Sequence, residues 1–157
     1  MKSKFRLLLF LIIDLALCNR KLNDILRVGI VSDNNSQYDV IVIGAGVAGL
    51  YQLFKLRQLK LKALVIEAGD NVGGTWYWNR YPGARFDSES WSYGYSFSKE
   101  LFEEWDWPEH FAAQPDTLRY LNYVADKFDF RRDIKFDRRV EACVFDQQNN
   151  LWTVRTN

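Results

Sequence analysis

A glycine-rich loop directly after a short apolar run constrains the fold more than any other feature of this chain. The run ends in Val-Ile-Val-Ile at residues 40–43, and the loop reads Gly-Ala-Gly-Val-Ala-Gly at residues 44–49. Continuous β-branched residues are typical of a parallel strand that is covered on both faces. The sequence therefore predicts a central strand that begins near Tyr38 and runs into a tight turn.

Each glycine of this loop has a different predicted task. Gly44 permits the tight turn, Gly46 lets the backbone approach a pyrophosphate, and Gly49 lets the following helix pack closely on the strand. We predict that helix from Val47 to Leu59, because its apolar side chains fall largely on one side. Its N-terminus would direct partial positive charge at the phosphates.

A second parallel strand is predicted at residues 62–66, with Glu67 at its carboxyl end. A carboxylate in that position can accept hydrogen bonds from both hydroxyls of a ribose. Strand, loop, helix, strand and acid fall in register, so we predict a site for a dinucleotide, FAD or NAD. The alternatives are a chance turn in an ordinary βαβ unit and a solvated carboxylate at the end of a strand.

The C-terminal part of the sequence adds a helix and a hairpin. The helix is predicted at Asp116–Phe128, opened by Pro115. Strand-like alternation follows at residues 134–136, 140–145 and 151–154, and turn-forming residues separate the last two segments. The predicted fold class is therefore α/β: a Rossmann-like FAD/NAD(P)-binding fold, incomplete, with a β-hairpin or meander at the C-terminal end.

The 157 residues leave room for about one domain, which we assign to residues 38–157. Residues 1–37 are predicted to be a leader and a linker. The apolar run at residues 7–17 contains Asp14 and is too short to span a bilayer. It is either a non-native extension or surface helix, or a targeting or membrane-attachment segment. We expect a cytoplasmic location, with a membrane-associated or secretory one as the alternative.

Charge and composition exclude several classes of partner. Lys and Arg number 21 against 20 Asp and Glu, so the net charge of +1 leaves no electrostatic footprint for nucleic acid. The two cysteines and the single histidine, His110, show no metal-ligand spacing. We therefore expect no nucleic-acid partner and no metal.

The residues after Glu67 favour FAD over NAD. A second glycine-rich turn, Gly73-Gly74, comes only a few residues later and leads into the aromatic run Thr75-Trp76-Tyr77-Trp78. Such a backbone-exposing turn is suited to lie against a flavin that extends past the ribose, whereas a nicotinamide domain needs little beyond its acid. For any single aromatic residue, packing in the core is the alternative.

The segment from Gly73 to Asp87, read with its surroundings, resembles the amino-terminal fingerprint of the Baeyer–Villiger monooxygenases. These are class B flavoprotein monooxygenases of the phenylacetone and cyclohexanone monooxygenase type. The resemblance covers residues 38–157, with further support in the segments 95–98, 104–107, 114–115 and 123–128. Phe86 stands where the resemblance leads us to expect a cysteine.

The resemblance implies a set of cofactor-binding residues. The first loop would hold the FAD pyrophosphate, Glu67 the adenosine ribose, and the aromatic run the flavin, while the backbone of Val140 would meet the adenine. Residues 85–87 would lie where the nicotinamide meets the flavin. The complete set is Gly44, Gly46, Val47, Ala48, Gly49, Glu67, Gly74, Thr75, Trp76, Tyr77, Trp78, Arg85, Phe86, Asp87, Ser88, Tyr93 and Val140.

The resemblance also implies a reaction in which NADPH reduces FAD and oxygen from O2 is inserted next to the carbonyl of a ketone, giving an ester or lactone. Asp87 is the predicted catalytic residue, since it would orient a catalytic arginine. The alternative for Asp87 is a turn aspartate that caps backbone groups of residues 88–90.

The chain by itself is expected to be inactive. No glycine follows Gly94, so a second phosphate-binding loop for NADPH is missing, as are the catalytic arginine and the later strands of the FAD sheet. We therefore interpret the chain as part of an NADPH- and FAD-dependent monooxygenase. Two alternatives stay open: part of an enzyme that oxygenates nitrogen or sulfur, and a non-catalytic remnant that binds flavin or a partner.

Overall fold

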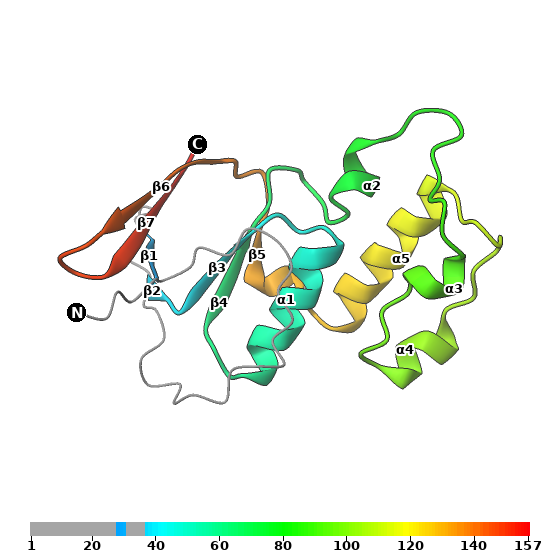
Figure 1. The fold of residues 1–157 in the computed structure, drawn as a ribbon, viewed down its shortest axis with the longest axis horizontal. Helices are drawn as coiled ribbons and strands as arrows, with labels where there is room; N and C mark the ends of the chain where they lie inside the picture. Colours follow the sequence, from blue (N-terminus) through cyan, green and yellow to red (C-terminus); the bar gives the residue numbers. More distant parts are fainter. Residues whose placement is uncertain (1–27, 31–36) are drawn as a thin grey trace, which may run out of the picture.

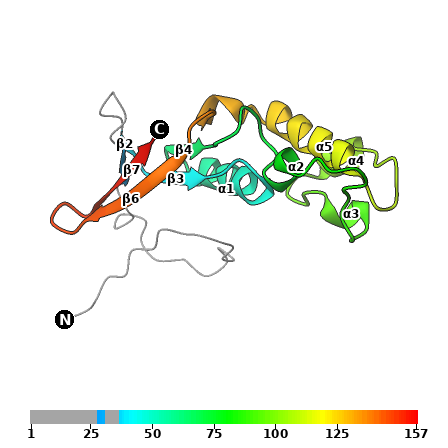
Figure 2. The same cartoon turned by 90° about the horizontal axis from the view of Figure 1, so that it is seen from above.

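The structure, a computed structural model, describes residues 28–30 and 37–157 (Figure 1). The apolar run at residues 7–17 lies outside these residues. In the described part, a small parallel sheet stands between a hairpin sheet at one end and a group of short helices at the other (Figures 1 and 2). This arrangement confirms the predicted α/β class with a separate C-terminal hairpin.

The parallel sheet has the strand order β3-β4-β5, with β3 at Val40–Ile43, β4 at Ala63–Ile66 and β5 at Ile134–Lys135. Helix α1, Val47–Gln58, connects the first two strands, and this confirms the predicted strand–loop–helix–strand unit. All four residues of β4 are buried because the sheet is covered on both faces.

Two hydrophobic clusters cover the two faces of this sheet. Val42 and Val65 pack in the larger cluster with α1 and α5, the helix at Gln114–Lys127. Ile41 and Leu64 point the other way and pack in a smaller cluster with the hairpin. Successive side chains of a strand alternate between faces, which is why an uninterrupted apolar run is needed here.

The hairpin pairs β6, Val140–Asp146, with β7, Leu151–Thr156, in antiparallel register, as predicted. Asp146 stabilises the turn, because its carboxylate accepts hydrogen bonds from the backbone NH groups of Gln148 and Asn149. The side-chain amide of Asn149 also donates to this carboxylate, at 2.7 Å, and this bond, followed by the backbone ones, lowers the pKa of Asp146.

The hairpin sheet also includes residues that precede Tyr38. Strand β1, Val28–Ile30, pairs in parallel with β7 and in antiparallel with β2, Gln37–Tyr38. The sequence predicts a linker over this stretch, because the hydrophobic pattern breaks up and residues 32–36 form a polar, turn-forming cluster. The strand is missed because its apolar segment is only three residues long and its pairing partner lies more than a hundred residues away. The domain boundary at residue 38 stays a prediction. The hairpin sheet, however, includes β1 and Gln37, which precede that boundary.

The region between β4 and α5 contains three short helices that the sequence does not predict: α2 at Thr75–Trp78, α3 at Ser90–Tyr93 and α4 at Lys99–Glu104. Helices of one or two turns are unstable by themselves and depend on tertiary contacts. Aromatic side chains supply these contacts here: Trp76 of α2 meets Tyr93 of α3 edge-on, and Trp105, directly after α4, packs against Tyr120 of α5. A single turn of 3-10 helix, Arg131–Asp133, precedes β5.

Arg57 joins the end of α1 to the segment that leads into β5. Its guanidinium donates two hydrogen bonds to the carboxylate of Asp133, at 2.8 and 2.6 Å, and one each to the carbonyls of Phe128 and Asp129. It also lies over the ring of Phe130, 5.1 Å from the centroid. A lysine cannot reproduce this planar set of donors.

We expect Arg57→Lys to lower the free energy of unfolding by about 2 kcal/mol, measured by urea denaturation, because charge-assisted hydrogen bonds are lost. Arg119→Lys is the matched control, since Arg119 is 62% exposed, forms an ion pair with Asp116 one turn away and lies over the ring of Trp105, contacts that a lysine can also make. Its expected loss is below about 0.5 kcal/mol. Equal losses in the two variants would contradict the structural role of Arg57.

Candidate dinucleotide-binding site

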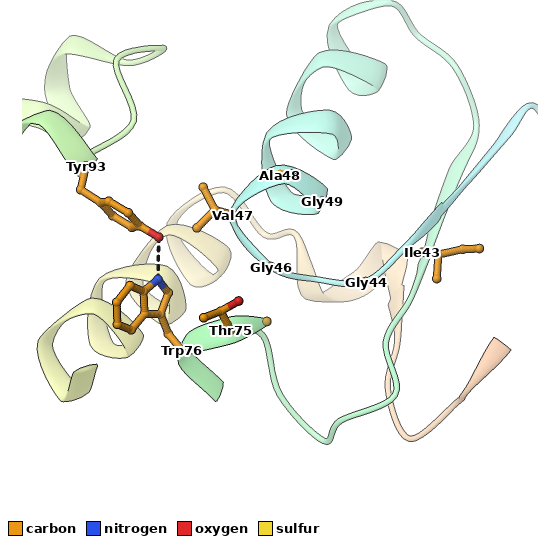
Figure 3. A pocket seen from close by; sticks show the side chains of 11 residues that line it. Ile43, Gly44, Gly46, Val47, Ala48, Gly49, Thr75, Trp76 and Tyr93 are labelled. Atoms are coloured by element: carbon orange, nitrogen blue, oxygen red, sulfur yellow. Dashed lines mark hydrogen bonds between the residues drawn. The ribbon is translucent and has the colours of Figure 1, made fainter. Parts of the chain in front are cut away.

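A cavity of about 370 Å³ opens at the carboxyl end of β3, beside the first turn of α1 (Figure 3). This is where dinucleotides bind in open α/β sheets. Most of its lining is backbone from two glycine loops, completed by a few side chains. The lining residues are Ile43, Gly44, Gly46, Val47, Ala48, Gly49, Gly73, Gly74, Thr75, Trp76 and Tyr93.

The first glycine loop keeps a shape that only glycine allows at two positions. Gly44 has a φ of +94°, and its NH donates to the carbonyl of Ile66 at 2.8 Å. A Cβ on Gly49 would lie 1.9 Å from the carbonyl oxygen of Gly44. Gly46 is the N-cap of α1 and provides no side-chain cap, so the first-turn NH groups are available to an anion at the cavity.

The second glycine loop packs directly on the first. Gly73 has a φ of +134° and donates its NH to the carbonyl of Ala45 at 3.0 Å. Gly74 has a φ of +53°, and a Cβ there would come within 2.8 Å of the Cα of Gly46. The two loops therefore meet main chain to main chain and leave a slot that side chains would fill. Such a slot fits the pyrophosphate of a dinucleotide.

Glu67 lies beside the slot and not in its lining. The side chain is buried, with the residue 4% exposed, and its two carboxylate oxygens accept hydrogen bonds from the NH groups of Ala45, at 2.6 Å, and Gly69, at 2.8 Å. Glu67 thus connects the first loop to the turn after β4. A carboxylate has about four acceptor positions, so these two bonds leave capacity for the ribose hydroxyls that the sequence predicts as its ligands.

Trp76 and Tyr93 form the aromatic wall of the cavity. The indole Nε1 of Trp76 donates to the hydroxyl of Tyr93 at 2.6 Å (Figure 3). Phe86 stacks on Tyr93 with 4.4 Å between ring centroids and meets Trp76 edge-on. The carbonyl of Trp76 accepts a hydrogen bond from the buried side-chain amide of Gln114. The wall is therefore held by the helices α3 and α5.

The structure brings together the predicted residues of the two loops with Thr75, Trp76 and Tyr93, and leaves the others outside the cavity lining. Phe86 is a core residue, and Arg85 is exposed and paired with Glu109 at 2.9 Å. Trp78, Asp87 and Ser88 are exposed. Asp87 makes no side-chain hydrogen bond or ion pair among the described residues, and its catalytic role stays a prediction. Val140 packs in the smaller hydrophobic cluster.

Several residues that shape the site are absent from the predicted set. Ile43 and Gly73 line the cavity. Tyr95 donates its hydroxyl hydrogen to the carbonyl of Val47 at 2.6 Å, and Tyr120 accepts a hydrogen bond from the NH of Tyr95 at 2.7 Å. Burial raises the pKa of Tyr95 and raises that of Tyr120 to about 12, so both phenols stay neutral at physiological pH. Ile43 stands directly before the first loop, and Gly73 belongs to the second glycine-rich turn, so the sequence offered a signal for both; no local pattern indicated the hydrogen bonds of Tyr95 and Tyr120.

Within residues 28–30 and 37–157, no group of three or more His, Cys, Asp or Glu side chains is arranged to hold a metal ion. The same part of the chain contains no helix with the length and apolarity that a bilayer crossing requires.

Fold and site together define a dinucleotide-binding domain of the Rossmann type. In agreement, residues 42–103 match the family of NAD(P)-binding Rossmann-like domains.

Relatives narrow this class further. A 2-oxo-Δ3-4,5,5-trimethylcyclopentenylacetyl-CoA monooxygenase from Pseudomonas putida is 53% identical over 74% of this chain and 21% of its own length. A methyl acetate-forming acetone monooxygenase from Gordonia sp. (strain TY-5) is 50% identical over 75% of this chain and 22% of its own length. A phenazine N-monooxygenase from Lysobacter antibioticus is 44% identical over 81% of this chain and 24% of its own length. The chain thus spans less than a quarter of the length of these relatives.

Solved structures of monooxygenases also resemble this chain in fold and sequence. A steroid monooxygenase bound to NADP superimposes with a TM-score of 0.75 and 57% identity, over 76% of this chain and 23% of that one. OTEMO in complex with FAD and NADP superimposes with a TM-score of 0.71 and 51% identity, over 74% of this chain and 22% of the OTEMO chain. The chain is homologous to one part of the Baeyer–Villiger monooxygenases, the family that its sequence resembles.

Proposed function

We propose that this chain is the FAD-binding portion of an NADPH-using monooxygenase that inserts oxygen next to a ketone carbonyl. The observation that carries this proposal is the slot between the two glycine loops, where Gly46 and Gly74 touch through their backbones at the N-terminus of α1. Homologues at 50% identity and above include an acetone monooxygenase and a structure that contains both FAD and NADP.

The residues present fit FAD. The first-turn NH groups of α1 would bind the pyrophosphate, Glu67 the ribose, and the pair Trp76–Tyr93 would border the flavin end. Bound FAD would supply the redox chemistry between NADPH, O2 and ketone, and the chain supplies position and exclusion of water. Asp87 and Arg85 are exposed near this wall, and we propose that they face the nicotinamide and the catalytic arginine of a longer polypeptide.

Titration of FAD with the purified chain tests the binding step. We expect quenching of flavin fluorescence with a stoichiometry of about one FAD per chain, and no NADPH-dependent oxygenation of ketones by the chain alone. Absence of any FAD binding would contradict the proposal and favour a non-catalytic remnant. Ketone oxygenation by the isolated chain would contradict its assignment as a partial enzyme.

A chimera tests the proposed activity. Residues 38–157 would replace the matching segment of the Gordonia acetone monooxygenase, and we expect conversion of acetone to methyl acetate to be retained. The same chimera with Gly49→Ala is the control and should lose both its FAD and its activity. A chimera that holds FAD but no longer oxidises acetone would contradict the assignment to ketone oxygenation.

A second candidate activity is oxygenation of nitrogen. The observation behind it is the phenazine N-monooxygenase among the relatives, which is 44% identical over 81% of this chain. An equivalent chimera with the phenazine N-monooxygenase, assayed with phenazine, separates the two activities. Activity in this chimera alone would favour nitrogen as the site of oxygenation.

A further inference from the structure

We propose that Tyr77 is a positioning residue for Glu67. In this proposal the ring of Tyr77 sets the turn after β4, so that helix α2 controls the adenosine end of the slot as well as its aromatic wall. The inference rests on the proposed dinucleotide site and goes beyond it, because the sequence assigns Tyr77 to the flavin, whereas in the structure Tyr77 lies outside the cavity lining.

The ring of Tyr77 lies directly against Gly69, in the turn after β4. A Cβ built on Gly69 would lie 2.7 Å from Cε1 of Tyr77, 3.1 Å from Cζ and 3.2 Å from Cδ1. Gly69 does not have a left-handed φ, so its backbone conformation alone does not demand glycine. A side chain at this position would have to displace the tyrosine ring, because the ring occupies the space of its Cβ.

The ring is held in this place by its neighbours. Its hydroxyl donates to Asp70 at 2.8 Å, directly after Gly69, and this hydrogen bond raises the pKa of Tyr77. The guanidinium of Arg80 lies over the ring at 4.7 Å from the centroid, and its Nε donates to the carbonyl of Tyr77 at 2.7 Å. Trp78 meets the ring edge-on at 4.7 Å.

A series of hydrogen bonds connects Gly69 to the slot. The NH of Gly69 donates to one oxygen of Glu67, and the NH of Ala45 in the first glycine loop donates to the other. The carbonyl of Gly69 accepts from the NH of Asp137, which holds the turn from its other side. Displacement of the Tyr77 ring would therefore loosen the turn and with it the carboxylate that faces the ribose.

Hydrogen exchange in the ligand-free chain tests the positioning directly. We expect Tyr77→Ala to accelerate amide exchange at Gly69 and Ala45 by about tenfold, beyond any change at core amides, because their hydrogen bonds are weakened by about 1.4 kcal/mol. Tyr77→Phe keeps the ring and should change the rate less than about threefold. Tyr81→Ala, at a tyrosine that is 64% exposed in the same segment, is the matched control and should change nothing.

Binding of the two halves of FAD tests the consequence for the site. In Tyr77→Ala we expect the affinity for ADP to fall about tenfold and the affinity for FMN to stay within about twofold. Equal losses for ADP and FMN, or exchange that rises equally at core amides, would overturn the proposal, because the ring would then be a general structural support.

Gly69→Ala, made in the wild-type and in the Tyr77→Ala background, tests whether the two residues act through their contact. Gly69→Ala should weaken ADP binding in the wild-type background and have little further effect in the Tyr77→Ala background, where the added methyl group no longer meets the ring. Additive losses would overturn the proposal. If the unmodified chain bound neither ADP nor FAD, the proposed function would fail, while exchange at Gly69 would still report the positioning.

Discussion

Gly49→Ala is expected to abolish FAD binding and to lower the free energy of unfolding by about 3 kcal/mol, at the upper end of the cost of overpacking. The added Cβ would lie 1.9 Å from the carbonyl oxygen of Gly44 and 3.0 Å from its carbonyl carbon. Both are backbone atoms, so the clash cannot be relieved by rotation of a side chain. Either the loop or the start of α1 has to move, and the slot loses its shape.

Flavin fluorescence measures the binding in this variant, and urea denaturation measures the stability. The matched control is Gly94→Ala, because a Cβ at Gly94 meets its nearest atom at 3.6 Å and the φ of −67° suits alanine. This control should bind FAD normally and gain up to about 1 kcal/mol through the lower entropy of the unfolded chain. If Gly49→Ala bound FAD with unchanged affinity, the close contact of loop and helix would not be essential to the site.

Glu67→Ala is expected to lower the free energy of unfolding by about 2–4 kcal/mol, because it leaves two buried NH groups without their acceptors. These are the NH groups of Ala45 and Gly69, which now bond to the two carboxylate oxygens. FAD affinity should fall at the same time, since the first glycine loop loses its connection to the turn after β4. Urea denaturation and FAD titration measure the two effects.

Two further variants define the role of this carboxylate. Glu67→Gln keeps the volume and one acceptor oxygen but turns an NH2 group toward a backbone NH, so an intermediate loss is expected. Glu103→Ala removes an exposed carboxylate whose partner is Lys99 at 3.4 Å. Its expected effect is below about 0.5 kcal/mol. A loss in Glu67→Ala no larger than in Glu103→Ala would mean that the buried hydrogen bonds contribute little.

The predicted residues divide according to how far their role depends on local sequence. The strand at residues 40–43, the loop after it and α1 follow from β-branched residues, glycine spacing and helical periodicity, all of which act over a few residues. The roles of the aromatic residues do not follow from such local patterns. Trp76 and Tyr77 are predicted to line the flavin and Phe86 to lie where the nicotinamide meets it, yet Phe86 packs in the core and Tyr77 covers Gly69, while Trp76 lines the cavity.

The sequence by itself determined the strand, the glycine turn and the helix at the predicted dinucleotide site, because these choices are made by backbone conformations that few residue types allow. Only the tertiary structure decided that the second glycine loop touches the first, that both oxygens of Glu67 are bound by backbone NH groups, and that β1 joins the hairpin. Apart from the hydrogen bond between Gly69 and Glu67, those contacts join segments about twenty to more than a hundred residues apart. They depend on the packing of many side chains at once, which no single motif encodes.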